Sequence, residues 1–342
     1  MAADIKFILT VDGGGIRGLV PALVLHDLEA RIAAERQARN LPPKPLHQCF
    51  DLMGGTSTGG IIVAGLAAPS AADPRRAACT PADLVDLYAD HGRTIFPELW
   101  LKTLRSLWGP LYSAQPLDRL LEERLGEARL SAALTNVVLC AYDTKERRAL
   151  FMAGGQGFGA NEPDYLAREA ARGSSAAPTF FPPAKVAALN APTAPHTLID
   201  GGVFANDPSM ATYVEALKLG WSNQRIEMLS LGTGSQNRPY PYHQIADWGI
   251  LRWLIYRGDH PLISILMQGV SSTTAYQMNQ LLNRDQDDRC YTRIDGALHG
   301  VSDELDDASP ANIAALRGLA ARWIEQHDDD LNGWAKRLAA RP

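Results

Sequence analysis

Cysteine is scarce in this sequence. Its four cysteines, Cys49, Cys79, Cys140 and Cys290, are spread over 342 residues, without a C-x-x-C motif or a zinc-type pairing with histidine. A disulfide framework or a zinc site needs ligands at short, regular spacings. We therefore expect reduced cysteines, no metal and no cofactor.

Long apolar runs and an excess of positive charge are also missing. No run of about 18 apolar residues occurs, and Asp12 interrupts the apolar start of the chain, so neither a spanning helix nor a signal peptide is expected. The net charge of −5 argues against nucleic acid as a partner and gives no attraction to anionic lipid. These features indicate a cytoplasmic protein.

The hydrophobic content is that of a folded enzyme. With 46% hydrophobic residues, 342 positions can bury a large core. Apolar strand patterns alternate with helical ones, which predicts a mostly parallel sheet covered on both faces. Strands are expected at residues 5–11, 49–53, 136–143, 149–152 and, as the last strand, 226–231. Helices are expected at residues 19–39, 163–172 and 208–219.

The most informative motif is a serine between glycines. The run Gly54-Gly55-Thr56-Ser57-Thr58-Gly59 contains the pattern G-x-S-x-G, between a predicted buried strand and a small-residue helix. On a strand-to-helix turn this pattern holds the serine in a strained elbow with an exposed hydroxyl, and the glycines let strand and helix pass closely. Ser57 is therefore a candidate nucleophile.

A second glycine cluster, Asp12-Gly13-Gly14-Gly15-Ile16-Arg17-Gly18, lies between the first strand and the first long helix. Backbone N–H groups at such a helix start point toward an anion, and glycine lets an oxygen come close. The N–H groups of Gly14 and Gly15 are thus candidates for an oxyanion hole. The cluster also matches the dinucleotide fingerprint, but no acidic residue follows a second strand about twenty residues later.

A third motif, Asp200-Gly201-Gly202, follows a short apolar approach at residues 197–199. Alone, this Asp-Gly-Gly motif would indicate an ordinary turn. An aspartate at the end of a strand can, however, also reach the nucleophile turn of a neighbouring strand. Together with the two glycine motifs, it makes Asp200 a candidate general base.

These three motifs stand intact and in order, and with them the sequence resembles the patatin-like phospholipases of bacterial type, a family of lipid acyl hydrolases. Residues 109–113 and 174–181 are also similar, and the resemblance covers about residues 5–234. It implies that Ser57 is the nucleophile and Asp200 its general base. The oxyanion hole would comprise Gly13, Gly14, Gly15, Arg17 and Gly18, with Gly55 and Gly59 in the elbow and Gly201 and Gly202 in the triplet.

The resemblance also implies the fold and the domain organisation. We expect a three-layer α/β/α domain with a central, mostly parallel sheet at residues 5–234, including a helical insert at 81–125. Residues 235–342 would form a helical C-terminal extension packed on it. Arg17 could bind a phosphate head group. An arginine in a first helical turn more often stabilises its own loop through hydrogen bonds, and we favour this structural role.

The implied activity is phospholipase A-type hydrolysis of membrane-lipid acyl esters through a Ser57–Asp200 dyad. Two alternatives stay open: a general carboxylesterase or thioesterase, and a cyclic-nucleotide-activated phospholipase effector of bacterial antiviral defence. A Ser-His-Asp triad is disfavoured, because no histidine has a suitable neighbourhood. The histidines considered are His196, His243, His260, His299 and His327. Expected partners are a membrane phospholipid or other acyl lipid, with peripheral contact at the inner membrane face, and a small-molecule activator and an oligomer are allowed for.

Two segments combine aromatic and leucine residues with basic ones, at residues 95–108 and 248–257. They contain Trp100, Trp108, Trp248 and Trp253. Such a composition is typical of an interfacial helix or a lid over an acyl channel, but also of core packing or a subunit contact. The pattern alone does not decide between these interpretations.

Overall fold

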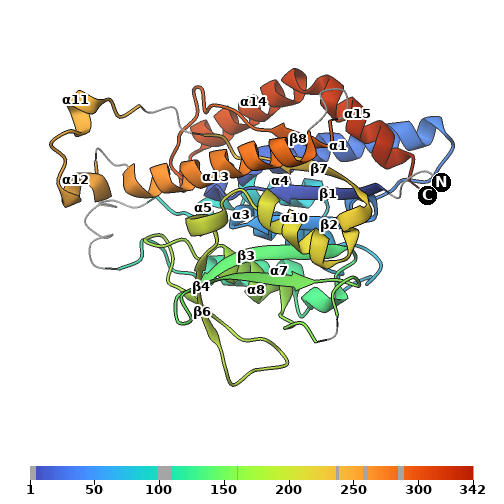
Figure 1. The fold of residues 1–342 in the computed structure, drawn as a ribbon, viewed down its shortest axis with the longest axis horizontal. Helices are drawn as coiled ribbons and strands as arrows, with labels where there is room; N and C mark the ends of the chain where they lie inside the picture. Colours follow the sequence, from blue (N-terminus) through green and yellow to red (C-terminus); the bar gives the residue numbers. More distant parts are fainter. Residues whose placement is uncertain are drawn as a thin grey trace.

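The structure, a computed structural model, describes residues 5–98, 109–159, 161–235, 239–256, 261–283 and 289–341. Its strands form one eight-stranded sheet in the order β5-β6-β3-β2-β1-β7-β8, with β4 also paired to β3 (Figure 1). The strands are β1 (Ile5–Val11), β2 (Leu52–Thr56), β3 (Asn136–Asp143), β4 (Arg148–Gly154), β5 (Ala184–Val186), β6 (His196–Asp200), β7 (Arg225–Leu231) and β8 (Tyr291–Ile294).

The helices occupy the connections between strands and the C-terminal region. Before β3 they are α1 (Leu19–Ala38), α2 (Leu46–Cys49), α3 (Thr58–Ala67), α4 (Pro81–Ala89), α5 (Gly92–Ile95) and α7 (Gln115–Leu125). Between β4 and β7 they are α8 (Ala167–Ser174), α9 (Gly202–Ala205) and α10 (Ser209–Lys218). After β7 they are α11 (Tyr242–Ile245), α12 (Ile250–Leu254), α13 (Pro261–Leu282), α14 (Pro310–Gln326) and α15 (Asp328–Ala339).

The centre of the sheet is parallel. β1 pairs in parallel with β2 and β7, β2 with β3, and β7 with β8. The antiparallel pairs, β3 with β4 and β6 and β5 with β6, lie on one side. The expected mostly parallel sheet is confirmed. Because parallel strands end at the same edge, the loops that follow β1, β2 and β7 meet there.

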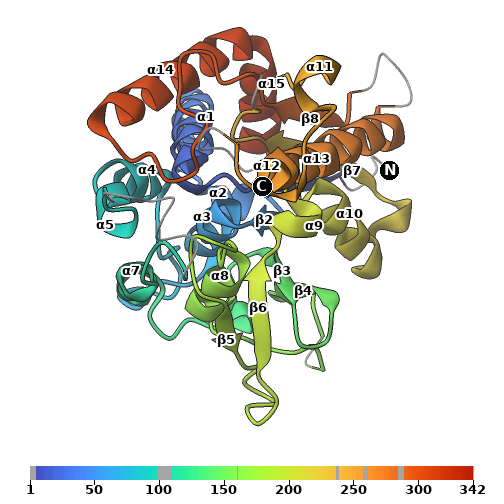
Figure 2. The same ribbon diagram turned by 90° about the vertical axis from the view of Figure 1, so that its left-hand side faces the viewer.

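Helices cover both faces of the sheet, and β1 shows how the sequence encodes this. Phe7, Leu9 and Val11 lie in one hydrophobic core with α1, α3, α4, α8, α14 and α15, whereas Ile8 lies in a second core with α10 and α13. Successive side chains of a strand point to opposite faces, so an uninterrupted apolar strand serves both layers. Figure 2 shows the two layers on either side of the sheet.

The C-terminal region is helical, as expected, but it also contributes strand β8 to the sheet. The prediction that residues 226–231 form the last strand is therefore wrong. The reason is that β8 is only four residues long and has Arg293 in its middle, so it lacks an apolar pattern. Trp334 of α15 packs edge-on against Phe7 of β1, with ring centroids 5.9 Å apart. The predicted boundary at residues 234 and 235 stays a prediction.

Three other predicted segments differ in detail. The strand expected at residues 49–53 is β2, which begins at Leu52 and ends at Thr56, because the chain up to Cys49 forms α2. The helix expected at residues 163–172 is α8, which begins four residues later, at Ala167, and ends at Ser174. The helical insert expected at residues 81–125 contains α4, α5 and α7, while residues 99–108 lie outside the described residues. Within the described ranges, no helix has both the length and the apolar character needed to cross a membrane.

Candidate active site

Ser57 lies in the turn between β2 and α3, with φ 56° and ψ −123°. Residues other than glycine rarely adopt a positive φ. The turn at Ser57 is therefore strained, and contacts with surrounding residues must stabilise it. The Ser57 N–H donates a hydrogen bond of 3.0 Å to the Ser174 hydroxyl, which donates in turn to the Cys140 carbonyl at 2.6 Å. A Cβ on Gly59 would lie 2.0 Å from the Val11 carbonyl oxygen, so only glycine lets α3 approach β1 this closely.

Asp200 ends strand β6, and the register of β3 brings it to Ser57. Thr56 of β2 pairs with Cys140 of β3, and the next residue, Ala141, pairs with Asp200. The ends of β2 and β6 therefore meet across β3. The Ser57 side chain faces the Asp200 carboxyl group closely enough to lower its pKa.

The Asp200 carboxyl is 4% exposed and sits in a setting suited to a base. Burial raises its pKa from the ordinary 3.8 to about 6, although hydrogen bonds from Ser57 and from the Gly202 N–H lower it. The Gly202 bond measures 2.7 Å. At neutral pH the group is mostly ionised, yet it is a better proton acceptor than an exposed aspartate.

The glycine loop runs beside this pair. Four of its N–H groups donate to backbone carbonyls, namely those of Asp12, Gly13, Ile16 and Arg17. In the part of the chain that the structure describes, the N–H groups of Gly14 and Gly15 have no such acceptor. Both glycines line the pocket that contains Ser57, and Gly15 has a φ of 59°. These two N–H groups can therefore bind an anionic oxygen of a ligand.

Arg17 is directed at the loop itself. Its guanidinium donates hydrogen bonds of 3.2 Å to the carbonyls of Gly14 and Gly234, and burial lowers its pKa to about 10. These contacts favour the loop-tying role. The remaining predicted glycines lie at close contacts around the site: Gly18 against Thr58, Gly55 against Gly59, and Gly201 against the Cys140 carbonyl.

Ser57 and Asp200 line a pocket of about 600 Å³. One side of the pocket is apolar and includes Ile61, Leu87, Ile95, Leu111, Phe180 and Phe181. A pocket with such walls suits a hydrocarbon chain, with the reacting atoms at its polar end. Within the described ranges no histidine lines the pocket, and no cluster of His, Cys, Asp or Glu is arranged to hold a metal.

The histidines considered from sequence lie elsewhere or are not described. His196 is in β6, but its Nδ1 lies 2.7 Å from the Asp143 carboxylate and its Nε2 3.3 Å from the Tyr165 hydroxyl. His260 lies outside the described residues. His243, His299 and His327 do not line the pocket.

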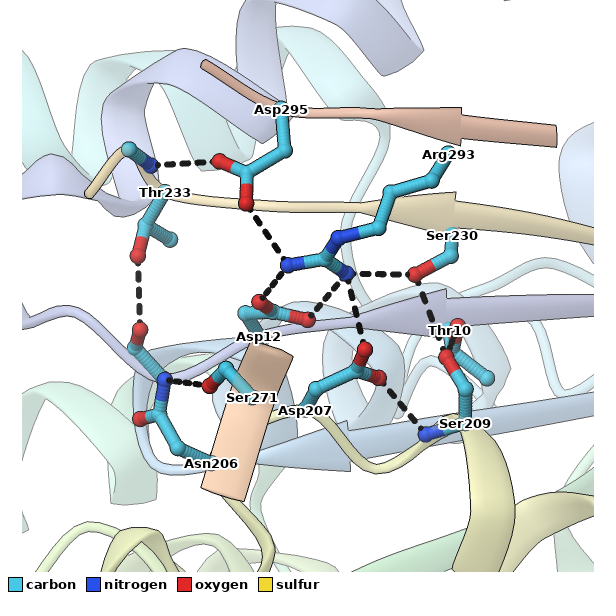
Figure 3. A network of polar contacts seen from close by, with 12 residues as sticks. Thr10, Asp12, Asn206, Asp207, Ser209, Ser230, Thr233, Ser271, Arg293 and Asp295 are labelled. Carbon is cyan, nitrogen blue, oxygen red and sulfur yellow. Dashed lines mark hydrogen bonds and ion pairs between the residues drawn. The ribbon is translucent and has the colours of Figure 1, made fainter. Parts of the chain in front are cut away.

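Sequence reasoning missed an arginine that organises the site from β8 (Figure 3). Arg293 donates hydrogen bonds to both oxygens of Asp12 (3.2 and 2.6 Å), to Asp207 (3.0 Å), to Asp295 (2.7 Å) and to the Ser230 hydroxyl (2.8 Å). Burial opposes the charge of this guanidinium, but the carboxylates hold its pKa above the ordinary value. No motif marks Arg293, and its only sequence signal is a short β-type run around a charge.

These contacts position the glycine loop on two sides. Asp12 begins the loop, and Asp207 follows Asn206, whose carbonyl accepts the Gly13 N–H at 3.0 Å. Thr233, at the end of β7, donates to the Gly13 carbonyl at 2.6 Å. Arg293 thus connects the loop to the segment that follows Asp200.

Comparison with known proteins shows which family the chain belongs to. The family model of patatin-like phospholipases matches residues 9–213. The chain is 34% identical to Patatin-like protein 1 of Oryza sativa subsp. indica, over 95% of this chain and 82% of that protein. It is 31% identical to Patatin-T5 of Solanum tuberosum, over 98% of this chain and 90% of the relative.

Among solved structures, VipD from Legionella pneumophila matches 94% of this chain and 67% of its own, with a TM-score of 0.42 and 10% identity. The family model and the plant relatives establish the relationship that the three motifs predicted: the protein belongs to the patatin-like phospholipase family, a family of lipid acyl hydrolases.

Proposed function

We propose that the protein is a serine lipid acyl hydrolase of the phospholipase A type, in which Ser57 is the nucleophile and Asp200 the general base. The observation that carries this proposal is that Ser57, in a strained elbow, and the buried Asp200 carboxyl face each other in one pocket. The apolar pocket beside them supports a fatty acyl ester as the substrate. Family membership supports the reaction class.

In the first half of the reaction, Asp200 accepts the Ser57 hydroxyl proton while Ser57 Oγ attacks the acyl carbon. A serine hydroxyl is a weak nucleophile until a positioned base takes its proton. The carbonyl oxygen becomes an oxyanion, which the N–H groups of Gly14 and Gly15 stabilise by about 3–4 kcal/mol per donor. The tetrahedral intermediate then expels the alcohol of the lipid, which takes the proton from Asp200, and leaves an acyl-Ser57 ester.

In the second half, a water molecule attacks the acyl-Ser57 ester and Asp200 accepts its proton. The second tetrahedral intermediate releases the fatty acid, and the proton on Asp200 returns to Ser57 Oγ. The same donors stabilise both oxyanions, so one arrangement serves both halves. Asp200 alternates between base and acid, a role that its pKa of about 6 supports.

Substitution of the two residues tests the proposal. Ser57→Ala and Asp200→Asn should each abolish release of fatty acid from phospholipid vesicles, and the double variant should lose no more than either single one, because the residues act as a unit. Circular dichroism checks that each variant is folded. A folded Asp200→Asn variant with near wild-type turnover would eliminate the dyad.

Histidine variants distinguish the dyad from a triad. Replacement of His196, His243, His260, His299 or His327 by alanine should leave most of the activity. A loss of about 10⁴-fold in any one of them is expected only for a triad member. His260→Ala is the most informative, because His260 lies outside the described residues.

Substrate preference tests the alternative function. Rapid turnover of short-chain soluble esters, with no release of fatty acid from phospholipid, would indicate a general carboxylesterase or thioesterase with the same residues. Activation by a cyclic nucleotide, self-association and location at the inner membrane face stay predictions.

A further inference from the structure

None of the 22 residues of helix α13 carries a charge. A surface helix of a soluble protein normally turns charged or polar side chains to water. On α13, Leu262, Ile265 and Leu266 are exposed instead, Leu266 by 57%. The preceding helix α12 adds Ile250 and Leu251, exposed by 78% and 81%. We call these five residues the α12–α13 face.

Exposed apolar side chains are concentrated in this part of the chain. In the described residues, 15 large apolar side chains are exposed, and nine of them lie between Tyr242 and Tyr276. Single exposed apolar residues are ordinary, but a cluster of them marks a surface that another body covers.

An aromatic cluster sets the orientation of α12. Trp248 is buried, and its ring packs against those of Tyr240, Trp253 and Tyr256, with centroids 4.5–5.4 Å apart. Trp248 therefore packs inward, and the exposed side chains of α12 are Ile250, Leu251, Arg252 and Leu254. Trp100 and Trp108 lie outside the described residues.

The inner side of α13 forms a wall of the active-site pocket. Met267 and Ser271 line the pocket, and the Asn206 side-chain amide donates to the Ser271 hydroxyl at 3.1 Å. Ile263 lines the pocket and is also exposed, so the pocket reaches the surface near the start of α13. One helix thus borders the route to Ser57 on one side and presents an uncharged apolar surface on the other.

Figures 1 and 2 show where α12 and α13 lie relative to the carboxyl ends of the central strands. β1 runs away from the N-terminal mark toward the left of Figure 1, where α12 and the start of α13 also lie. In the turned view of Figure 2, α12 and the start of α13 face the viewer. The α12–α13 face and the carboxyl ends of the central strands are therefore at the same end of the molecule.

We propose that the α12–α13 face docks on an electrically neutral lipid bilayer and holds the pocket opening against it. This inference rests on the proposed function, because it identifies where the substrate enters. The absence of charge on α13 and the net charge of −5 both favour apolar insertion over attraction to anionic head groups. A bilayer also fits the location better than a protein partner, since a protein seated here would cover the opening beside Ile263, whereas a bilayer supplies acyl chains there.

Vesicle flotation tests the docking. In a Ser57→Ala background, which prevents hydrolysis, Leu251→Ser with Leu266→Ser should weaken binding to phosphatidylcholine vesicles by about tenfold or more. The matched control is Leu41→Ser with Val214→Ser, which removes two exposed apolar side chains from other surfaces and should leave binding unchanged. Binding should change little when NaCl is raised from about 0.05 M to about 0.5 M, because screening acts on charges.

Activity measurements with intact Ser57 separate the docking from the chemistry. The Leu251→Ser, Leu266→Ser variant should hydrolyse phosphatidylcholine vesicles at least about tenfold more slowly and a soluble short-chain ester at the wild-type rate. Unchanged flotation, or a wild-type dimer that this variant disperses, would overturn the docking. Equal loss on both substrates with a lower melting temperature would assign these side chains to the core and also overturn it. A wild-type protein that floats with vesicles but cleaves neither substrate would reject the proposed function and leave the docking supported.

Discussion

The guanidinium of Arg293 donates hydrogen bonds to both carboxylate oxygens of Asp12, 281 positions away in the sequence. Asp12 begins the glycine loop beside Ser57, and Arg293 lies in the short strand β8. The loop that would bind the oxyanion is therefore held by a residue outside the matched family region, 9–213. Through this pairing the C-terminal region would support the proposed chemistry without contributing a reacting atom.

Removal of this guanidinium should damage both stability and turnover. In Arg293→Met, Asp12, Asp207 and Asp295 lose their shared cation, and a buried uncompensated charge costs about 3–5 kcal/mol. We expect a lower melting temperature and a large loss of kcat. Burial already raises the pKa of Asp12 well above its ordinary value, and without Arg293, whose charge lowers it, this pKa should rise further, so part of the lost stability should return as the pH falls. Differential scanning calorimetry between about pH 5 and pH 8 measures this, and a pH-independent deficit would contradict the explanation.

The rate should depend on pH through Asp200. Its pKa is about 6, and a base works only when it is ionised. Therefore kcat/KM on a soluble ester should fall about tenfold per pH unit below about pH 6 and level off above about pH 7. A stopped assay across this range gives the profile. A midpoint that moves when a histidine is replaced would point to a different base.

Asp200→Asn should stabilise the protein while it abolishes activity. The folded-state pKa is raised from 3.8 to about 6, so the ionised carboxylate costs folding free energy above that pH, at most about 3 kcal/mol. Asparagine keeps the shape and the Gly202 hydrogen bond without the charge. The gain in melting temperature over wild type should be largest near pH 8 and should vanish below about pH 3, where Asp200 is protonated in both the folded and the unfolded state. The exposed Asp86→Asn is the control and should show no such gain.

Ser174 should be a positioning residue for the elbow. Ser174→Ala removes the acceptor of the Ser57 N–H and the donor to the Cys140 carbonyl, and each buried group left unpaired costs about 1–3 kcal/mol. We expect kcat to fall by about tenfold or more with little change in KM, because the turn relaxes while the pocket stays. Ser175→Ala is the matched control, since that hydroxyl bonds only to carbonyls of its own helix region. Equal effects of the two variants on kcat would show that Ser174 has no special role.

The local parts of the site could be predicted from sequence. The glycines around Ser57 and in residues 13–18 stand at a recognisable spacing, although the contacts that require them, such as Gly59 with Val11 and Gly18 with Thr58, come from distant segments. The meeting of Ser57 with Asp200 depends on the register of β2, β3 and β6, which no local pattern encodes. The family resemblance predicted that Ser57 and Asp200 act together. The pairing of β2 and β6 with β3 gives the physical reason why they meet.

Other features could not be predicted because they depend on tertiary packing. Arg293 resembles any surface arginine in sequence, and only its three carboxylate partners explain why its guanidinium is held in the interior of the site. The aromatic run near Trp248 indicates an amphipathic segment, but which side faces outward is decided by Tyr240 and Tyr256. In both cases the deciding partners are absent from the local sequence.

Because strand β8 comes late in the chain, its contacts should also determine when during protein synthesis the proposed site can form. A nascent chain exposes Ser57 and Asp200 long before the ribosome reaches Arg293, and until then no cation neutralises Asp12 and Asp207. We therefore expect the proposed site to be completed only near the end of translation, and ribosome-bound chains stalled before residue 290 should hydrolyse no ester.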